Sequence, residues 1–220
     1  MVERTLLLVC EGETDIYVFQ ALSKHYSNTN IELKIILLAP QQDATSGTYP
    51  SFGYGSVLNW CESNKNKINL LIDFQGASAL LLQMDTDIAM QVNSSCMLQN
   101  KSARQCCEEK INQKFDTTKE PEKCHYILPT ESTETWLLAS YTNFSALNNS
   151  CKLLVNFEHV ADTVDLLIDL GFPRKGRKLR KTPAKSYIKH SKQLVDNIVI
   201  AKSRCDELDR LCQLLDNYAQ

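Results

Sequence analysis

The sequence has no long apolar segment, and its first residues do not have the pattern of an export signal. Even its longest uninterrupted apolar runs, such as Leu6 to Cys10, are far shorter than the roughly 18 to 20 residues that cross a bilayer, so we predict no membrane span. Glu3 precedes the run and Glu11 follows it, without a basic leader or a small-residue cleavage site. This argues against a signal peptide. We therefore expect the protein to remain in the cytoplasm.

Neither sign of charge is in excess over the whole chain. Its 220 residues include 24 Lys and Arg against 26 Asp and Glu, with 43% hydrophobic residues. These proportions are those of an ordinary globular protein and exclude disorder, collagen and coiled coil as descriptions of the whole. The length is enough for a sizeable core, and we expect one main domain with a helical appendage.

Paired cysteines at the spacing of a zinc site are missing. The nine cysteines are odd in number and come without an export signal, which favours reduced thiols over a disulfide framework. Only Cys106 and Cys107 are close in sequence, so a structural zinc site is disfavoured. Most of the cysteines are expected to be small buried hydrophobic residues.

The first 130 residues alternate between apolar strand-like runs and helical spacing. Two short helices are expected within 56–74, separated by a polar break at 63–67, and a long surface loop within 40–55. Further helices are expected at 14–23 and 102–115, and strands at 4–10, 31–38, 79–84 and 124–128. This alternation predicts an α/β domain with a four-stranded, largely parallel sheet.

Beyond Pro129 the pattern becomes helical only, and positive charge gathers in one stretch. We expect helices at 131–141, 160–170, 184–195 and 199–218, and no strand. Residues 174–192 hold nine Lys and Arg and no acidic residue, which leaves 15 basic against 26 acidic residues elsewhere. This stretch is either a solvated loop or a phosphate-binding surface. We favour phosphate binding by Arg174, Lys175, Arg177, Lys178, Arg180 and Lys181.

Carboxylates follow three of the four predicted strands. Glu11 ends the first strand, Asp85 and Asp87 end the third, and Glu131 and Glu134 lie just beyond the fourth. The carboxyl ends of parallel strands share one edge of a sheet, where ligands bind. Carboxylates brought together there repel one another unless a cation neutralises them, and such oxygen ligands suit Mg²⁺ or Mn²⁺.

These residues resemble a known family. The segments LLLVCEGETD and, about 70 residues later, ALLLQMDTD resemble the Rossmann-like TOPRIM domain of topoisomerases, bacterial primases and several nucleases, over roughly residues 4–140. The acidic Asp15 resembles the nuclease branch typified by the overcoming-lysogenization-defect (OLD) proteins. Glu134 and Lys185 stand where that branch has a later glutamate and a lysine. The phrase around Glu134 also resembles small stand-alone TOPRIM-like proteins of bacterial defence gene clusters.

The resemblance implies a TOPRIM domain over 1–140 and a helical extension over 141–220, with the basic segment at 174–192. It implies a Mg²⁺- or Mn²⁺-dependent nuclease that acts in anti-phage defence with an ATPase partner. The chain has no GxxxxGK[ST] motif, so ATP hydrolysis would come from a separate subunit. The substrate could be DNA, tRNA or another RNA. The expected metal ligands are Glu11, Asp15, Asp85, Asp87 and Glu134, and Lys185 would steady the transition state.

Several alternatives stay open at the level of sequence. Asp15 could face the ion or only stabilise the first turn of its helix, and Glu131 competes with Glu134 for the later position. Gln83 stands where the OLD group often has serine. The main rival function is a non-catalytic TOPRIM-like module that binds a partner or nucleic acid. A primase-like or topoisomerase-like enzyme is disfavoured, because the chain lacks their further domains.

Overall fold

The structure is a computed structural model. It describes residues 1–41, 45, 52–142, 156–160, 162–176, 178–179 and 185–220. Within these ranges, no helix has the length and apolar character required to cross a membrane.

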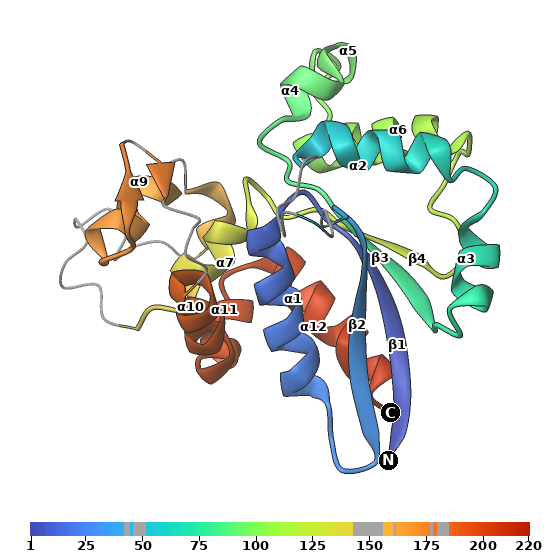
Figure 1. Cartoon of the computed structure of the whole chain (residues 1–220). Helices are drawn as coiled ribbons and strands as arrows, with labels where there is room; N and C mark the ends of the chain where they lie inside the picture. The colour runs from blue at the N-terminus through green and yellow to red at the C-terminus, as the bar shows by residue number, and fades with distance from the viewer. Residues whose placement is uncertain (42–44, 46–51, 143–155, 161, 177, 180–184) are drawn as a thin grey trace.

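A four-stranded sheet forms the centre of the molecule (Figure 1). Its strands lie in the order β2-β1-β3-β4, and every neighbouring pair is parallel. The predicted α/β fold with a largely parallel four-stranded sheet is therefore confirmed, and a Rossmann-like arrangement is compatible with it. The strand bounds are β1 (Val2–Val9), β2 (Ile31–Ala39), β3 (Ala79–Gln83) and β4 (Cys124–Ile127).

The apolar run in β1 is fully buried because helices cover both faces of the sheet. Leu6 and Leu8 belong to one hydrophobic cluster, whereas Leu7 and Val9 belong to a second. Successive side chains of a strand point to opposite faces, so one apolar segment supplies both clusters. The first cluster includes residues of α1, α7 and α10 to α12, and the second includes residues of α2, α3 and α6 (Figure 1).

The helices of the first half largely follow the predicted pattern. The expected break at 63–67 separates α2 from α3, and the helix expected at 102–115 is α6. Two one-turn helices between β3 and α6 were not predicted. The bounds are α1 (Glu13–Tyr26), α2 (Tyr54–Ser63), α3 (Ile68–Phe74), α4 (Ala89–Val92), α5 (Ser94–Met97) and α6 (Ala103–Phe115).

The C-terminal part differs from the prediction in two places. A two-residue hairpin, β5 (Arg174–Lys175) with β6 (Lys178–Leu179), stands where no strand was expected. The single helix expected at 199–218 is two helices, and the bend between them places Arg204, which donates to the carbonyl oxygens of Ala139 and Tyr141. The helix bounds are α7 (Thr133–Ala139), the 3₁₀ helix η1 (Phe157–His159), α9 (Thr163–Asp169), α10 (Lys185–Asp196), α11 (Ile198–Lys202) and α12 (Asp206–Tyr218).

One cluster of buried residues joins the two halves of the sequence. Leu6 and Leu8 of β1 share it with Leu208, Leu211 and Leu215 of α12. The predicted division at residue 140 stays a prediction, but the core on this face of the sheet is built from both sides of it.

The expectation of reduced thiols is wrong for one pair of cysteines. Cys96 of α5 and Cys106 of α6 form a disulfide. Sequence spacing gave no sign of it, because the folding of α4 and α5 onto α6 brings the two residues together. The other described cysteines are free and buried, as expected for small hydrophobic residues. Cys151 lies outside the described residues.

Candidate functional site

The topology of the sheet places Glu11 and Asp85 beside each other. The chain leaves β1 to form β2 on one side and later returns to form β3 on the other side, so its order reverses between β1 and β3. In open parallel sheets, the crevice at the carboxyl ends of two such strands is the usual ligand site. Glu11 follows β1 and Asp85 follows β3. The backbone N–H of Asp85 donates to Oε1 of Glu11 at 2.9 Å.

Gln83 fixes the spacing between these two acidic residues. Its side chain is completely buried at the end of β3. Oε1 of Gln83 accepts from the backbone N–H of Glu11 at 3.0 Å, and its Nε2 donates to Oδ1 of Asp85 at 2.7 Å. One amide thus bridges the ends of both strands.

Asp15 stabilises the first turn of α1, one of the two roles expected for it. Its side chain accepts from the backbone N–H of Gly12 at 3.0 Å and from the hydroxyl of Thr133 at 2.5 Å. A carboxylate in the first turn also interacts favourably with the helix dipole. The contact with Thr133 ties α1 to the start of α7.

Glu134 lies in the first turn of α7, and a residue of α10 holds its side chain. The hydroxyl of Tyr187 donates to Oε1 of Glu134 at 2.9 Å, and both side chains are buried. The following residues, Trp136 to Leu138, are buried, and Trp136 packs near Phe19 of α1. These contacts hold Glu134 toward the end of the sheet that carries Glu11 and Asp85, and we call the site made of Glu11, Asp15, Asp85, Asp87 and Glu134 the acidic edge.

Negative charges act on one another across this edge. Burial raises the pKa of Asp85 well above its usual range, and the charges of Asp15, Glu11, Glu134 and Asp87 raise it further. The pKa of the partly exposed Asp87 is also raised, first by loss of hydration and then by Glu131 and Glu134. Asp85 is thus close enough to the other four predicted ligands for their charges to act on it. These four are Glu11, Asp15, Asp87 and Glu134.

Glu131 and Glu134 differ in their surroundings. Glu131 has a left-handed backbone (φ 64°), and its carbonyl oxygen accepts from the N–H of Asp87 at 3.3 Å. Its charge acts on Asp87, whereas the charge of Glu134 acts on both Asp85 and Asp87. This favours Glu134 as the later ligand, which stays a prediction.

The donor chemistry of the site suits a hard divalent cation, because every candidate ligand is a carboxylate. Among the residues that the structure describes, however, no three Asp, Glu, His or Cys side chains lie close enough to form a ready-made metal site. Protein donors engage Glu11, Asp15, Asp85 and Glu134 instead. A bound ion would have to exchange some of these hydrogen bonds for metal–oxygen bonds.

The predicted basic residues are described only in part. Arg174 and Lys175 are exposed on β5, and Lys178 contributes its backbone to β6. Arg177, Arg180 and Lys181 lie outside the described residues. Lys185 is the exposed first residue of α10.

Three residues that contact the candidate ligands were missed at the level of sequence. Thr133 and Tyr187 follow patterns typical of a helix start and of a buried helix face, so nothing singled them out. Gln83 was noticed only as a departure from serine. Its position two residues before Asp85, at the end of a buried strand, was a usable signal, because a buried amide needs hydrogen-bond partners.

The chain was also compared with known proteins. No family model, curated protein or solved structure matches it.

Proposed function

We propose that the protein is a TOPRIM-type nuclease that requires Mg²⁺ or Mn²⁺ and cleaves phosphodiester bonds in DNA or RNA. One observation carries the proposal: Glu11 and Asp85 lie in hydrogen-bond contact at the carboxyl ends of the two strands where the order of a parallel sheet reverses. Anti-phage defence together with an ATPase partner is the cellular role that the sequence resemblance implies.

In this proposal Glu11, Asp85, Asp87 and Glu134 hold the cation, with Asp15 beside them. The bound ion would polarise the scissile phosphate and lower the pKa of the attacking water. Gln83 and Tyr187 keep two of the carboxylates oriented, in the way that hydrogen-bond partners of metal ligands do. Arg174, Lys175 and their basic neighbours would bind the phosphate backbone, and Lys185 would neutralise developing negative charge.

Cleavage assays test this proposal. The purified chain is incubated with plasmid and with total tRNA while Mg²⁺ or Mn²⁺ is titrated, and Glu11→Gln is compared with Glu3→Gln. Glu3 is a half-exposed acid at the opposite end of β1, paired with Lys34. We expect cation-dependent cleavage that Glu11→Gln abolishes and Glu3→Gln preserves. Full activity of Glu11→Gln would refute the assignment.

A second candidate function, a non-catalytic TOPRIM-like binding module, is favoured by the hydrogen bonds that already engage the carboxylates. In such a module these acidic residues would only hold the strand ends and helix starts together. The two functions are separated by isothermal titration with Mn²⁺. A module of this kind would neither bind the ion at the acidic edge nor cleave either substrate.

A further inference from the structure

A groove lies beside the acidic edge. It runs between the end of β2 and the helices α2 and α3, with a volume of about 460 Å³. Leu38, Pro40 and Leu71 supply apolar lining, and Trp60, Asn59 and Gln41 are among the residues that complete it. The volume lies within the roughly 300 to 1,000 Å³ of small-molecule sites.

Two backbone hydrogen bonds join the groove to the acidic edge. The N–H of Cys10 donates to the carbonyl of Ala39, which lines the groove, at 2.9 Å. The N–H of Gly53, which caps α2, donates to the carbonyl of Glu11 at 2.6 Å. Trp60 stands six residues after the first residue of α2, or about 9 Å along the helix at 1.5 Å per residue. One end of the groove is therefore hydrogen-bonded to the segment that carries Glu11, and Trp60 lies about 9 Å further along α2.

The described lining of the groove is uncharged and combines one aromatic ring with amide side chains. None of the described residues that line the groove carries a charge, so the groove does not select for a phosphate or a carboxylate. Trp60 is half-buried, and its ring meets Phe115 edge to face at 6.5 Å, which fixes the orientation of the indole. The exposed amides of Gln41 and Asn59 each offer donors and an acceptor, as the edges of bases require.

We propose that this groove binds an unpaired base of a single-stranded nucleic acid, stacked on Trp60, beside the bond that the acidic edge cleaves. This inference rests on the proposed nuclease function and adds the class of substrate. Aromatic side chains bind single strands by stacking on bases whose faces are free. In a duplex the bases are stacked and paired within the helix, so a half-buried ring in a groove cannot reach their faces.

Binding is measured without cleavage, in EDTA, so that the test does not depend on the nuclease. Short single-stranded DNA and RNA are added while tryptophan fluorescence is recorded. The chain has two tryptophans, and Trp136 is completely buried, so quenching reports Trp60. We expect both single strands, or one of them, to quench the emission, and a matched duplex and a free mononucleotide to leave it unchanged. Binding of only the DNA or only the RNA strand would support the proposal and show whether the site prefers deoxyribose or ribose.

Variants separate stacking from general affinity, with labelled single strands followed by fluorescence anisotropy. Trp60→Leu should weaken binding about tenfold, which corresponds to about 1.4 kcal/mol, whereas Trp60→Phe should retain most of the affinity. Phe74→Leu is the matched control, because Phe74 is an exposed aromatic residue of α3 outside the groove. Its affinity should equal that of the original chain. Thermal unfolding of each variant checks that the contact with Phe115 is not needed for folding.

Three results would overturn the groove assignment. The first is unchanged single-strand affinity of a folded Trp60→Leu, and the second is an equal loss of affinity for duplex and single strand in that variant. The third is quenching by the mononucleotide while Trp60→Leu keeps its full single-strand affinity. None of these results touches the nuclease proposal, which the Glu11→Gln cleavage assay decides. Conversely, a chain that cleaves nothing but loses single-strand affinity in Trp60→Leu would keep the groove and lose the nuclease.

Discussion

The carboxylate of Glu207 and the carboxylates of the acidic edge lie at different places in the molecule and have different electrostatic surroundings. Glu207 of α12 accepts hydrogen bonds from Arg104 at 2.5 Å, from Arg210 at 2.7 Å and from the N–H of Leu128 at 2.7 Å. At the acidic edge, the charges that act most strongly on Asp85 are those of other carboxylates.

The ion pairs of Glu207 stabilise the fold, whereas the repulsion among the carboxylates around Asp85 opposes it. Arg104 and Glu207 join α6 to α12, and Arg210 also donates to the carbonyl of Tyr126 at the end of β4. Removal of a buried carboxylate with such partners leaves the partners without an acceptor. Burial and mutual repulsion at Asp85 disfavour its ionisation, and under the proposed function a bound cation would offset this repulsion. The following predictions test this contrast, beginning with the largest expected effect.

Asp85→Asn should remove activity while leaving the protein at least as stable. An asparagine keeps the acceptor for Gln83 but removes the charge, so we expect cleavage to fall more than about 100-fold, since even partners of metal ligands contribute 10- to 100-fold. The relief of repulsion should raise the unfolding midpoint in urea. Asp73→Asn, an exposed acid of α3, is the control and should change neither quantity. Full activity in Asp85→Asn would place the chemistry elsewhere.

Glu207→Ala should have the opposite effect. It leaves Arg104, Arg210 and the N–H of Leu128 without their acceptor, and we expect the free energy of unfolding to fall by about 3 kcal/mol. Urea denaturation followed by circular dichroism measures it. Glu108→Ala removes only the more exposed partner of Arg104 and should cost less than about 0.5 kcal/mol. If both variants lost the same free energy of unfolding, Glu207 would contribute no more than an exposed ion-pair partner, and the contrast would fail.

Tyr187→Phe tests whether α10 positions Glu134. Loss of the hydroxyl leaves a buried carboxylate oxygen without its donor, which should lower stability by about 1 kcal/mol and cleavage by about 10-fold. In the control, Tyr218→Phe removes the hydrogen bond to His125 and should lower stability without lowering cleavage. An equal loss of cleavage in both variants would indicate a structural effect only.

The pH dependence of stability gives the smallest effect. Because the pKa of Asp85 is raised in the folded protein, the native state holds this proton more tightly than the unfolded chain. The stability that this proton contributes is complete below about pH 4, the pKa of an aspartate in the unfolded chain. It is lost as the pH rises through the pKa of Asp85 in the folded protein. The stability advantage of Asp85→Asn should therefore grow as pH rises toward neutrality, and saturating Mg²⁺ should reduce it. An advantage that is constant with pH would show that repulsion at Asp85 is not its cause.

The sequence predicted the sheet and the acidic edge for a physical reason. Buried strands of a parallel sheet need continuous apolar runs, as in Leu6 to Val9, and the polar residue that ends each run falls at one edge. The strand order could not be predicted, although it alone makes Glu11 and Asp85 neighbours. It depends on how the helices pack on the two faces.

Contacts between segments far apart in the chain could not be predicted from the sequence. The hydrogen bond between Tyr187 and Glu134 spans 53 residues, and Arg104 and Glu207 are 103 residues apart. No local pattern encodes such pairs, because each partner satisfies its own helix equally well without the other. The disulfide between Cys96 and Cys106 was missed for a related reason, since it depends on two one-turn helices with weak periodicity.

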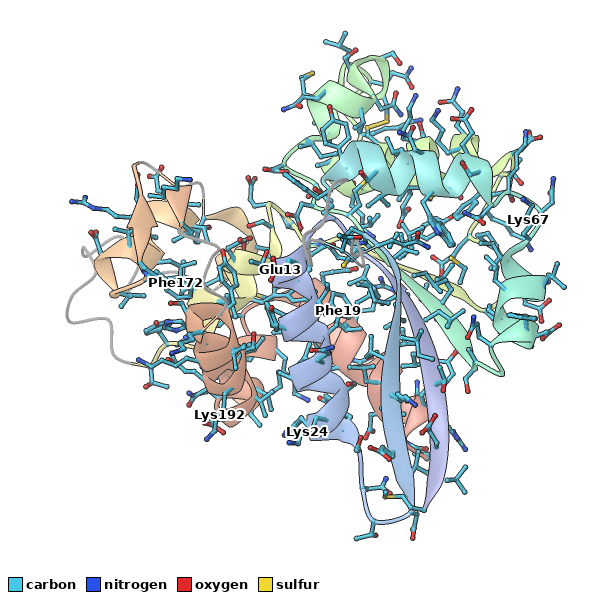
Figure 2. The ribbon with its side chains drawn as sticks, viewed as in Figure 1. Glu13, Phe19, Lys24, Lys67, Phe172 and Lys192 are labelled. Atoms are coloured by element: carbon cyan, nitrogen blue, oxygen red, sulfur yellow. A yellow bond between two sulfur atoms is a disulfide. The ribbon has the colours of Figure 1, made fainter. Side chains whose placement is uncertain are left out.

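Both ends of the chain lie at the edge of the sheet opposite the acidic residues. Arg4 donates to the carbonyl of Tyr218 at 3.0 Å, Asn28 donates to that of Ala219 at 2.8 Å, and the N and C marks lie close together at the lower end of β1 in Figure 1. Glu13, at the start of α1 beside the acidic edge, lies at the other end of that helix from Lys24 (Figure 2). A surface tether at either end would therefore present the acidic edge outward to solution. The same proximity makes the ends suitable for joining by a short linker, so that new ends could be opened elsewhere in the chain.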